Sequence, residues 1–453
     1  MIDNFTLLEP QYVKTTWQTL VEFWQFNDMN VLWVLIGSIL LGVSASVIGS
    51  FAFLRRRSLI GDALAHAALP GVMMAFLLFQ TRDPWIMFFG AIITSFIGFF
   101  IIDWLPKNTK IKPDAALAIT LSFFFALGLM MLSFIQGMEV ANKSGLDKIL
   151  FGQAAAMTNE DIKLLMYVAI FVLVTVVLFF QKFRLIAFNT PYARSLGIAV
   201  NRYELLLALL IVMSVVVGLQ LVGVVLMAAV LLTPVATARL WTEQLHKMLM
   251  LAGVVGALSA IISTQISYLA PAMPTGPWMV VSLSVLFFLS LLFAPQKGLL
   301  KRYLEQRQLR KKVSEENILR TLYKLWERSE FEQHDFNISD IQALRAMNPQ
   351  DLRKHLKQLN RKNLLVESTH GFRLTETGLE QATQLTRRHR LWENYLNEHL
   401  ELSPDQVHSQ AERMEHILTL EQEQQLEEEL KDSRKDPHGN PIPDASPLTG
   451  GAK

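Results

Sequence analysis

The chain has 453 residues, of which 51% are hydrophobic and 18% are charged, and it contains no cysteine. Residues 297–453 carry 25 Lys or Arg and 26 Asp or Glu, which leaves only 31 charged residues among the 296 before them. The long apolar blocks of that first part exclude a single soluble domain. The lack of cysteine excludes a disulfide-stapled secreted protein and restricts any metal site to nitrogen and oxygen ligands.

The first part of the chain predicts an all-α polytopic membrane domain of about nine transmembrane helices. Residues 1–30 have mixed charge and no long apolar run, so we expect an extracytoplasmic or interfacial segment there and no cleaved signal peptide. The membrane domain then covers residues 31–296. Most of its apolar blocks are long enough to cross about 30 Å of hydrocarbon. The blocks lie near residues 31–54, 62–80, 85–104, 114–135, 162–181, 203–219, 221–238, 248–269 and 278–294.

The basic residues between these blocks predict how the chain is oriented. Clusters of Lys and Arg follow the first, third, fifth, seventh and ninth blocks, and the alternate loops are poor in both. By the positive-inside rule the basic loops are cytoplasmic, so the N-terminus lies outside and the charged C-terminal part lies inside. We place the break between the sixth and seventh blocks at Gly218 and Gln220.

Asp62 and His66 are ionisable residues inside the second apolar block. Residues four apart on a helix share one face, one turn from each other. A carboxylate and an imidazole inside a span are costly, and together they supply half of a site for a divalent cation. The alternative is that Asp62 caps the helix and His66 hydrogen-bonds within the bundle. Gly61, Pro70 and Gly71 predict a broken or kinked helix, of the kind that lines transporter cavities.

The loop at 182–203 is expected to contain a short cytoplasmic helix. Asn189 or Thr190 caps it, Pro191 occupies its first turn and Gly197 ends it. Such a helix is suited to docking a partner protein, and a simple connector is the alternative.

Several stretches of the membrane part resemble the zinc, manganese and iron class of ABC-importer permeases. The stretches that carry the resemblance are Arg56–Gly71, Leu150–Gly152, Tyr192–Ile198, Leu221–Arg239 and Pro274–Trp278. The resemblance implies two permeases, either two copies or two homologues, with two ATPases and an extracytoplasmic metal-binding protein. It also implies that Asp62 and His66 meet the metal in the translocation path. The residues implied to couple to the ATPase are Pro191, Ala193, Arg194 and Gly197.

The absence of a nucleotide-binding loop agrees with that division of labour. The chain contains no Gly-x-x-x-x-Gly-Lys-[Ser/Thr] sequence, so ATP hydrolysis must come from another subunit. No Ser–His–Asp or nucleophile-elbow pattern supports an enzyme either.

The C-terminal part predicts a basic linker and a winged helix-turn-helix on the cytoplasmic side. We expect the linker at 297–313 as a helix continuing from the last span, and the winged helix at 314–376. The third helix of this unit is basic and could enter a major groove. The near-neutral charge of the region instead favours a solvated face or a protein-docking module. Its helices are expected near 314–326, 338–346 and 349–363, and its strands near 364–368 and 372–375.

A helical region at 377–445, followed by a tail at 446–453, carries His and Glu at metal-binding spacing. His389 and Glu393 are four residues apart. A second set lies on one stripe of a helix and consists of His408, Glu412, Glu415 and His416. Such clusters are typical of Mn²⁺, Fe²⁺ or Zn²⁺ sites without cysteine, and an exposed polar helix face is the alternative.

Residues 314–445 resemble the iron- and manganese-dependent repressors, the family that includes the diphtheria-toxin repressor. The strings that carry this resemblance are Arg387–Glu393, Val407–His416 and Asp436–Pro443. The resemblance implies a metal-binding and dimerisation region with two sites. One site would contain Glu412, Glu415 and His416, and the other would contain His389, Glu393 and His408.

Two positions depart from the pattern of that family. Asn317 stands where the first helix has an Asp or Met ligand, and Arg320 stands near where manganese-type members have a Glu. Asn is a poor ligand and Arg is none. One site is therefore expected to be weakened, and metal-switched DNA binding is in doubt.

Together these patterns predict a permease subunit of an ATP-driven importer of divalent metal in a bacterial inner membrane, with manganese ahead of iron or zinc. The C-terminal region would sense cytoplasmic metal and slow transport. The alternative is a membrane-tethered, metal-dependent transcription regulator. The expected partners are the ATPase, the extracytoplasmic binding protein, a second permease and lipid, and binding to DNA stays open.

Overall fold

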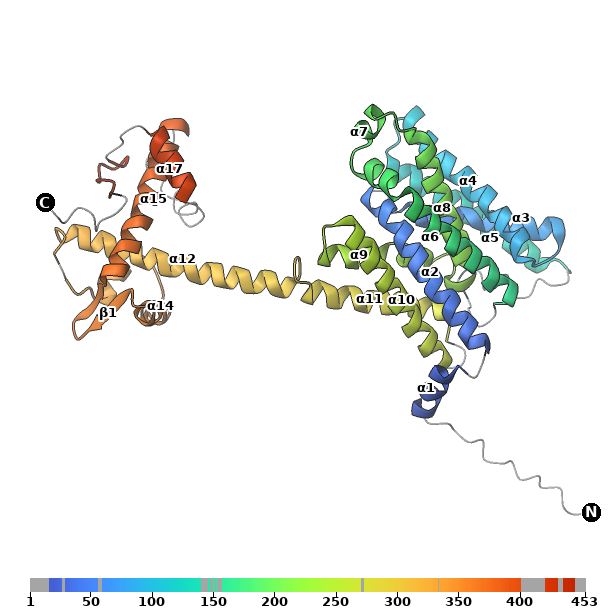
Figure 1. Cartoon of the computed structure of the whole chain (residues 1–453), viewed down its shortest axis with the longest axis horizontal. Helices are drawn as coiled ribbons and strands as arrows, with labels where there is room; N and C mark the ends of the chain where they lie inside the picture. Colours follow the sequence, from blue (N-terminus) through green and yellow to red (C-terminus); the bar gives the residue numbers. More distant parts are fainter. Residues whose placement is uncertain are drawn as a thin grey trace, which may run out of the picture. The chain divides into compact units, whose positions relative to one another are not determined.

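The computed structural model describes residues 16–26, 29–55, 59–139, 157–269, 273–332, 334–400, 420–430 and 435–444, with Leu146, Leu150 and Gly152. The chain divides into two compact units, Met1–Lys301 and Arg302–Lys453. Helices make up most of the described chain (Figure 1). The predicted tail at 446–453 lies outside the described residues.

The first unit is a bundle of apolar helices. Its elements are α1 (Thr16–Gln25), α2 (Met29–Leu54), α3 (Ile60–Phe79), α4 (Pro84–Asn108), α5 (Pro113–Gly137), α6 (Asn159–Phe188), α7 (Thr190–Ser195), α8 (Val200–Val222), α9 (Met227–Trp241), α10 (Leu245–Leu269) and α11 (Thr275–Phe293). Among the described residues, eight helices are long and apolar enough to cross a membrane, and α9 is an additional apolar helix of 15 residues. The predicted all-α membrane domain is confirmed, and each predicted block corresponds to one helix.

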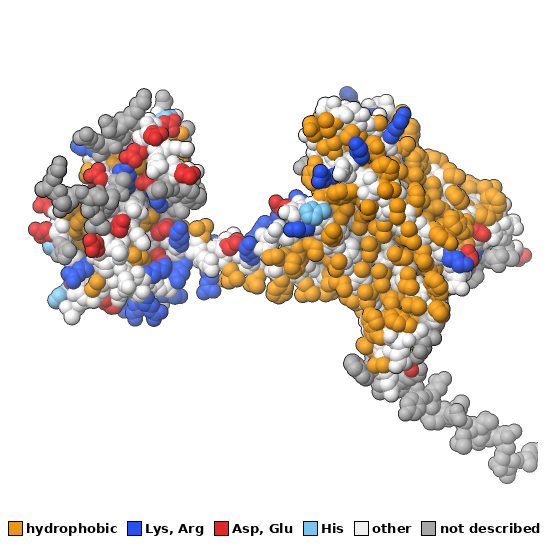
Figure 2. All heavy atoms as spheres, viewed as in Figure 1, with side chains coloured by type: hydrophobic (Ala, Val, Ile, Leu, Met, Phe, Trp, Pro, Cys, Tyr) orange, Lys and Arg blue, Asp and Glu red, His pale blue; other side chains and the backbone are white. Residues whose placement is uncertain are grey.

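The surface of this unit is suited to hydrocarbon. Large apolar side chains point outward, among them Phe100, Val177 and Met250, which are 67%, 75% and 70% exposed. Figure 2 shows that hydrophobic side chains cover most of the visible face of this unit. Apolar patches of that extent are not tolerated in water, so the solvent here is lipid. Inside the bundle, α3 packs against α4 and α5, while α2 packs against α6, α9 and α10.

The break between α8 and α9 lies later than the sequence predicted. Gly218 and Gln220 both lie inside α8, which ends at Val222. Gly223 starts the turn, with a φ of 94° that favours glycine. Gly218 instead packs against Met227, where a side chain would collide. Its small size therefore serves close packing and does not end the helix.

Of the predicted break or kink in α3, the break is not observed. The helix runs through Pro70 and Gly71 to Phe79 without a break. A Cβ on Gly71 would meet the backbone of Gly90 and the hydroxyl of Thr94, so this glycine lets α3 and α4 approach closely.

The second unit contains the predicted order of three helices and a hairpin. It holds most of α12 (Leu299–Arg328), then α13 (Ile338–Leu344) and α14 (Pro349–Arg361). Strands β1 (Leu365–Ser368) and β2 (Gly371–Leu374) pair antiparallel, and α15 (Glu376–Leu400) and α17 (Leu420–Glu429) follow. Its core is formed by the inward faces of these elements, including Ile318, Leu322, Ile341, Leu356 and Phe372.

The predicted linker at 297–313 does not continue from the last span. Helix α11 ends at Phe293, and α12 begins at Leu299 and runs on without interruption to Arg328. The turn between them contains Gly298, where a Cβ would collide with the Ala294 backbone. The basic stretch is therefore the first half of the first winged-helix helix.

Replacing Gly256 of α10 by Leu should destabilise the membrane unit. A side chain there would meet the Gly42 carbonyl and the Ser46 hydroxyl of α2. Overpacking of this kind costs about 1–3 kcal/mol, so the midpoint of thermal unfolding in detergent should fall. Gly137→Leu is the control, because nothing lies within 4 Å of its Cβ position. Equal midpoints for the two variants would contradict the packing argument.

Candidate functional site

Asp62 and His66 lie together inside the bundle. Because α3 begins at Ile60, Asp62 occupies its first turn and His66 lies one turn further on. His66 Nε2 is 3.4 Å from Asp62 Oδ1, and the two side chains are 9% and 26% exposed. The imidazole packs edge-on against Phe125 of α5, with ring centroids 4.6 Å apart. A half-buried carboxylate and a buried imidazole therefore share one face of α3.

The other nitrogen of His66 is unused by the described residues. Nδ1 is buried and makes no hydrogen bond to any residue that the structure describes. A neutral imidazole with its proton on Nε2, toward Asp62, keeps a lone pair on Nδ1. An unpaired buried acceptor costs about 1–3 kcal/mol, and the described residues leave this atom without a hydrogen-bond partner.

The alternative role for Asp62 as a helix cap has no support in the described residues. The N-cap of α3 is Leu59, and no side chain caps it. Asp62 instead has His66 as its neighbour.

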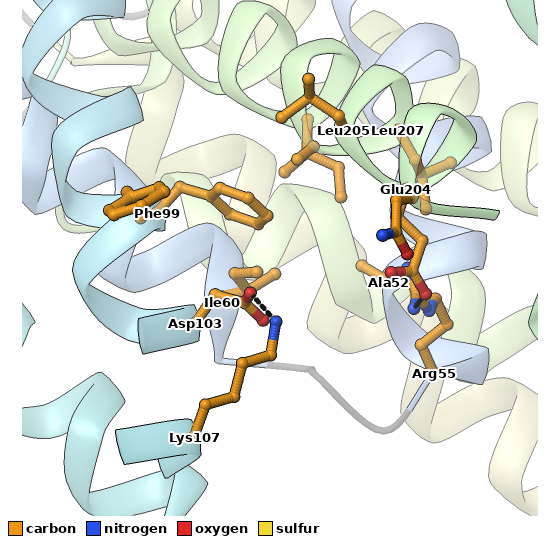
Figure 3. A pocket seen from close by; sticks show the side chains of 13 residues that line it. Ala52, Arg55, Ile60, Phe99, Asp103, Lys107, Glu204, Leu205 and Leu207 are labelled. Atoms are coloured by element: carbon orange, nitrogen blue, oxygen red, sulfur yellow. Dashed lines mark hydrogen bonds and ion pairs between the residues drawn. The ribbon is translucent and has the colours of Figure 1, made fainter. Parts of the chain in front are cut away.

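A cavity of about 240 Å³ lies among the ends of α2, α4 and α8. Figure 3 shows two charged pairs in its wall, Arg55 with Glu204 and Asp103 with Lys107. The cavity also touches Ile60, the first residue of α3, but its lining does not include Asp62 or His66. Its carboxylates face Arg and Lys side chains, so the cavity as it stands is not arranged as a cage for a cation.

The predicted short helix is present as α7. Asn189 Oδ1 accepts a hydrogen bond from the Tyr192 amide at 3.0 Å, and Pro191 lies in the first turn. Gly197 follows the helix with a φ of 73°. The predicted cap, first turn and end of the helix are therefore all observed.

Of the four predicted coupling residues in and after helix α7, one is buried against the bundle and three are exposed. Ala193 is fully buried and packs with Ile186 and Val200. Pro191, Arg194 and Gly197 are exposed. The helix is thus held on the bundle by its alanine and offers its other predicted coupling residues to the surface.

In the second unit, His389 and Glu393 lie together on α15. His389 Nε2 is 3.0 Å from Glu393 Oε1, and the two side chains are 2% and 3% exposed. Arg320 Nη1 is 2.6 Å from His389 Nδ1. Because a guanidinium only donates, Nδ1 accepts and Nε2 carries the proton toward Glu393. Both nitrogens of His389 are engaged, so this histidine can ligate a metal only if Arg320 moves.

The other predicted ligands of the second unit are His408, Glu412, Glu415 and His416, and all four lie outside the described residues. Asn317, at the position where the repressors have a ligand, is buried on α12. Its Oδ1 has no hydrogen-bond partner among the described residues. At the two positions that depart from the repressor pattern, the interior therefore contains the cationic side chain of Arg320 and the neutral amide of Asn317.

A bidentate ion pair also ties α12 to α15. Arg390 donates to Glu327 Oε1 at 3.0 Å and to Oε2 at 2.6 Å. Next to this pair, burial raises the pKa of the Tyr323 hydroxyl, the Glu327 carboxylate raises it further, and Arg390 lowers it. Tyr323 therefore stays neutral in this interior at neutral pH.

One group was not singled out as a site by sequence reasoning. Glu393, Asp436 and His438 each place one ligand atom within 4.8 Å of the others. Two carboxylates and an imidazole are a donor set that fits Mn²⁺, Fe²⁺ or Zn²⁺. The Asp-Pro-His-Gly string at 436–439 was the available signal, but nothing in the sequence placed it beside Glu393.

Residues 27–294 match the family described as the ABC 3 transport family. The chain belongs to the ABC 3 transport family. Residues 375–444 of this permease match the iron dependent repressor, metal binding and dimerisation domain. Both resemblances drawn from the sequence are thereby confirmed.

Similar proteins match most of this permease or about two thirds of it. The manganese transport system membrane protein MntC of Bacillus subtilis is 38% identical over 84% of this permease and 87% of its own length. The zinc transport system membrane protein TroC of Treponema pallidum is 35% identical over 63% of this permease and 95% of itself. A solved structure, PsaBC from Streptococcus pneumoniae in complex with Fab, is 32% identical, with a TM-score of 0.56 over 64% of this permease and 98% of that chain.

Replacing Arg320 by Met should loosen the contact between α12 and α15. The variant removes the donor to His389 Nδ1 and leaves a buried acceptor, which costs about 1–3 kcal/mol. Hydrogen exchange of the full-length protein should then show faster exchange in the middle of α15. Arg310→Met, at an exposed position of α12, is the control and should exchange like the parent. Unchanged protection in Arg320→Met would show that the contact contributes nothing.

Proposed function

We propose that the chain is the permease subunit of an ATP-driven importer of divalent metal, with manganese ahead of iron or zinc as the substrate. The observation that carries this proposal is the buried pair Asp62 and His66, whose Oδ1 and Nε2 atoms lie 3.4 Å apart on one face of α3. Ionisable groups inside apolar spans mark ion pathways. The manganese and zinc systems among the relatives support the choice of substrate.

The pair acts on the ion by replacing part of its water shell. Asp62 supplies an anionic oxygen and His66 a neutral nitrogen, a combination that suits Mn²⁺, Fe²⁺ and Zn²⁺. Two donors are fewer than the four or more that these ions take. Water or the same pair on a second permease completes the shell, and this incomplete hold lets the ion leave again.

We infer the partners from two features of the chain, which are the lack of a nucleotide-binding loop in its sequence and the exposed helix α7. ATP hydrolysis is supplied by a separate ATPase subunit, which docks on α7 through Pro191, Arg194 and Gly197, with Ala193 anchoring the helix. The metal is delivered by an extracytoplasmic binding protein. The basic loops put the N-terminus outside and the second unit in the cytoplasm.

The second unit serves as a cytoplasmic metal sensor. Its match to a metal-binding and dimerisation domain supports this role. Cytoplasmic metal would load the unit and shift its packing, and the transporter would slow down. Such a shift requires that the two states of the unit bind metal with different affinity.

One observation favours the alternative function, which is a membrane-tethered transcription regulator. Helix α14 exposes Arg353, Lys354, Lys357 and Arg361. A basic helix of this kind suits a phosphate backbone, and its binding would weaken steeply with salt. The transport experiment below separates the two, because a regulator with only an anchoring membrane unit would not move metal.

Replacing Asp62 by Asn or His66 by Ala should abolish most transport. The protein would be assembled with its ATPase in liposomes, and ATP-driven Mn²⁺ uptake would be measured with Fe²⁺ and Zn²⁺ as competitors. Loss of a metal donor should lower uptake at least tenfold, because two donors already hold the ion only partly. Asp114→Asn, exposed in the first turn of α5, is the matched control and should transport normally. Normal uptake by both site variants would disprove the path.

Removing the second unit should remove the feedback. A chain ending at Lys301 keeps the first compact unit, and the matched structure of PsaBC covers 64% of this chain. With Mn²⁺ preloaded on the side of the second unit, full-length protein should slow down and the truncated protein should not. Equal inhibition of both would show that the second unit does not sense metal.

A further inference from the structure

We propose that a groove on the lipid-facing side of the membrane unit binds one anionic phospholipid. The groove has a volume of about 620 Å³ and is lined by residues of α2, α6 and α10. Helix α2 packs against both α6 and α10, and its half-buried Val43 and Val47 lie in the groove between them. None of the residues assigned to the metal path or to the ATPase contact lines this groove, so lipid binding is a function beyond the proposed transport.

The groove is open to the hydrocarbon of the bilayer. Val177 of α6 lines it together with Met250 and Val254 of α10, and all three side chains are exposed. Among the described residues of the lining, only His246 is polar. Aliphatic walls of this kind suit an acyl chain and exclude a polar ligand over most of the length of the groove.

The length of the groove matches one leaflet of a bilayer. On α10 the lining runs from His246 to Ala257, which corresponds to about 16 Å of helix at a rise of 1.5 Å per residue. One leaflet supplies roughly 15 Å, half of the hydrocarbon core. An acyl chain that starts at the membrane surface beside His246 would therefore fill the groove down to the middle of the bilayer.

Gly253 keeps the groove open, although the packing of α10 on α2 does not require a glycine there. A Cβ at Gly253 would lie 3.5 Å from Val43 and 3.9 Å from Val47, which is ordinary contact. At Gly256, by contrast, a side chain would collide with the α2 backbone. Small residues in spans usually let two backbones approach, and Gly256 has that role. Gly253 instead leaves space that a longer side chain would fill.

The selectivity of the groove depends on the headgroup of the lipid. Lipid tails are as apolar as the side chains of a span, so an acyl chain gains little by leaving bulk lipid for the groove. Phe180 is the last lining residue on α6 and His246 is the first on α10. By the positive-inside rule, both helices have this end on the cytoplasmic side. The choice of leaflet therefore rests on the orientation proposed above.

Cationic and hydrogen-bonding side chains surround this end of the groove. Arg184 lies beside Phe180, with its Cζ 6.0 Å from the ring centroid, and Lys247 follows His246. All three polar side chains are exposed, and neither Arg184 nor His246 pairs with a carboxylate in the part of the chain that the structure describes. A guanidinium binds phosphate oxygens in pairs, and the imidazole adds a ring N–H donor. Basic pockets between spans favour headgroups with a net negative charge.

The test measures the binding of dioleoylphosphatidylglycerol to the full-length protein in detergent. Native mass spectrometry gives the dissociation constant of the first bound lipid, and zwitterionic dioleoylphosphatidylcholine is the comparison. The parent should prefer the anionic lipid by about fivefold or more, the effect of one cationic contact near the membrane surface. Arg184→Gln combined with His246→Gln should remove this preference. Lys182→Gln, exposed on another face of α6, is the matched control and should keep it.

A second variant blocks the part of the groove that holds the acyl chain. Gly253→Leu should weaken the binding of dioleoylphosphatidylglycerol by at least as much, because the added side chain fills the groove. Its midpoint of thermal unfolding should equal that of the parent, since the new Cβ makes only ordinary contacts. Gly137→Leu, where nothing lies within 4 Å of the Cβ position, is the control and should bind lipid like the parent.

Three results would overturn the site. The first is equal affinity of the parent for the two lipids. The second is unchanged binding of dioleoylphosphatidylglycerol in both the Arg184–His246 double variant and Gly253→Leu. The third is a change from dimer to monomer in Gly253→Leu with an unchanged lipid count, which would assign the groove to a second permease. No metal is measured in this test, so its failure is distinguishable from failure of the proposed transport function.

Discussion

A carboxylate and an imidazole 3.4 Å apart inside an apolar bundle set the demands on the whole membrane unit. Burying ionisable groups in hydrocarbon costs several kcal/mol unless they are enclosed by protein. The bundle encloses them because α3 is one of its most buried spans. In the 18-residue apolar stretch of α3, 72% of the residues are buried inside the protein. Gly61 and Gly71 serve this enclosure, because a side chain at either would collide with α9 or α4.

The second unit also buries charged groups, and there they are arginine side chains. Arg320 and Arg390 are both at most 4% exposed, and each joins α12 to α15 through a hydrogen-bonded partner. Buried charges are tolerated only when paired in this way. The guanidinium of Arg320 engages His389, one of the two residues of the predicted ligand pair His389 and Glu393. The fold also brings Glu393 close to Asp436 and His438 in the loop at 435–441.

Local sequence rules predicted the elements better than their ends. Asn189, Pro191 and Gly197 predicted α7 correctly, because capping, first-turn proline and a left-handed glycine are local requirements. The predicted end of α8 at Gly218 was wrong. A glycine that makes room for Met227 looks the same in the sequence as a glycine that ends a helix. The basic stretch before Ser314 was wrongly joined to the last span, because its helical pattern does not reveal the turn at Gly298.

The sequence by itself determined that the chain has an apolar helical part and a charged part, and that Asp62 and His66 share one helix face. These properties follow from hydropathy and from the 3.6-residue period, which need no knowledge of distant contacts. Only the tertiary structure decided that Arg320 reaches His389 and that Asp436 and His438 meet Glu393. Those residues are separated by 43 or more positions, and their side chains come together only when the helices pack, so no local pattern encodes them.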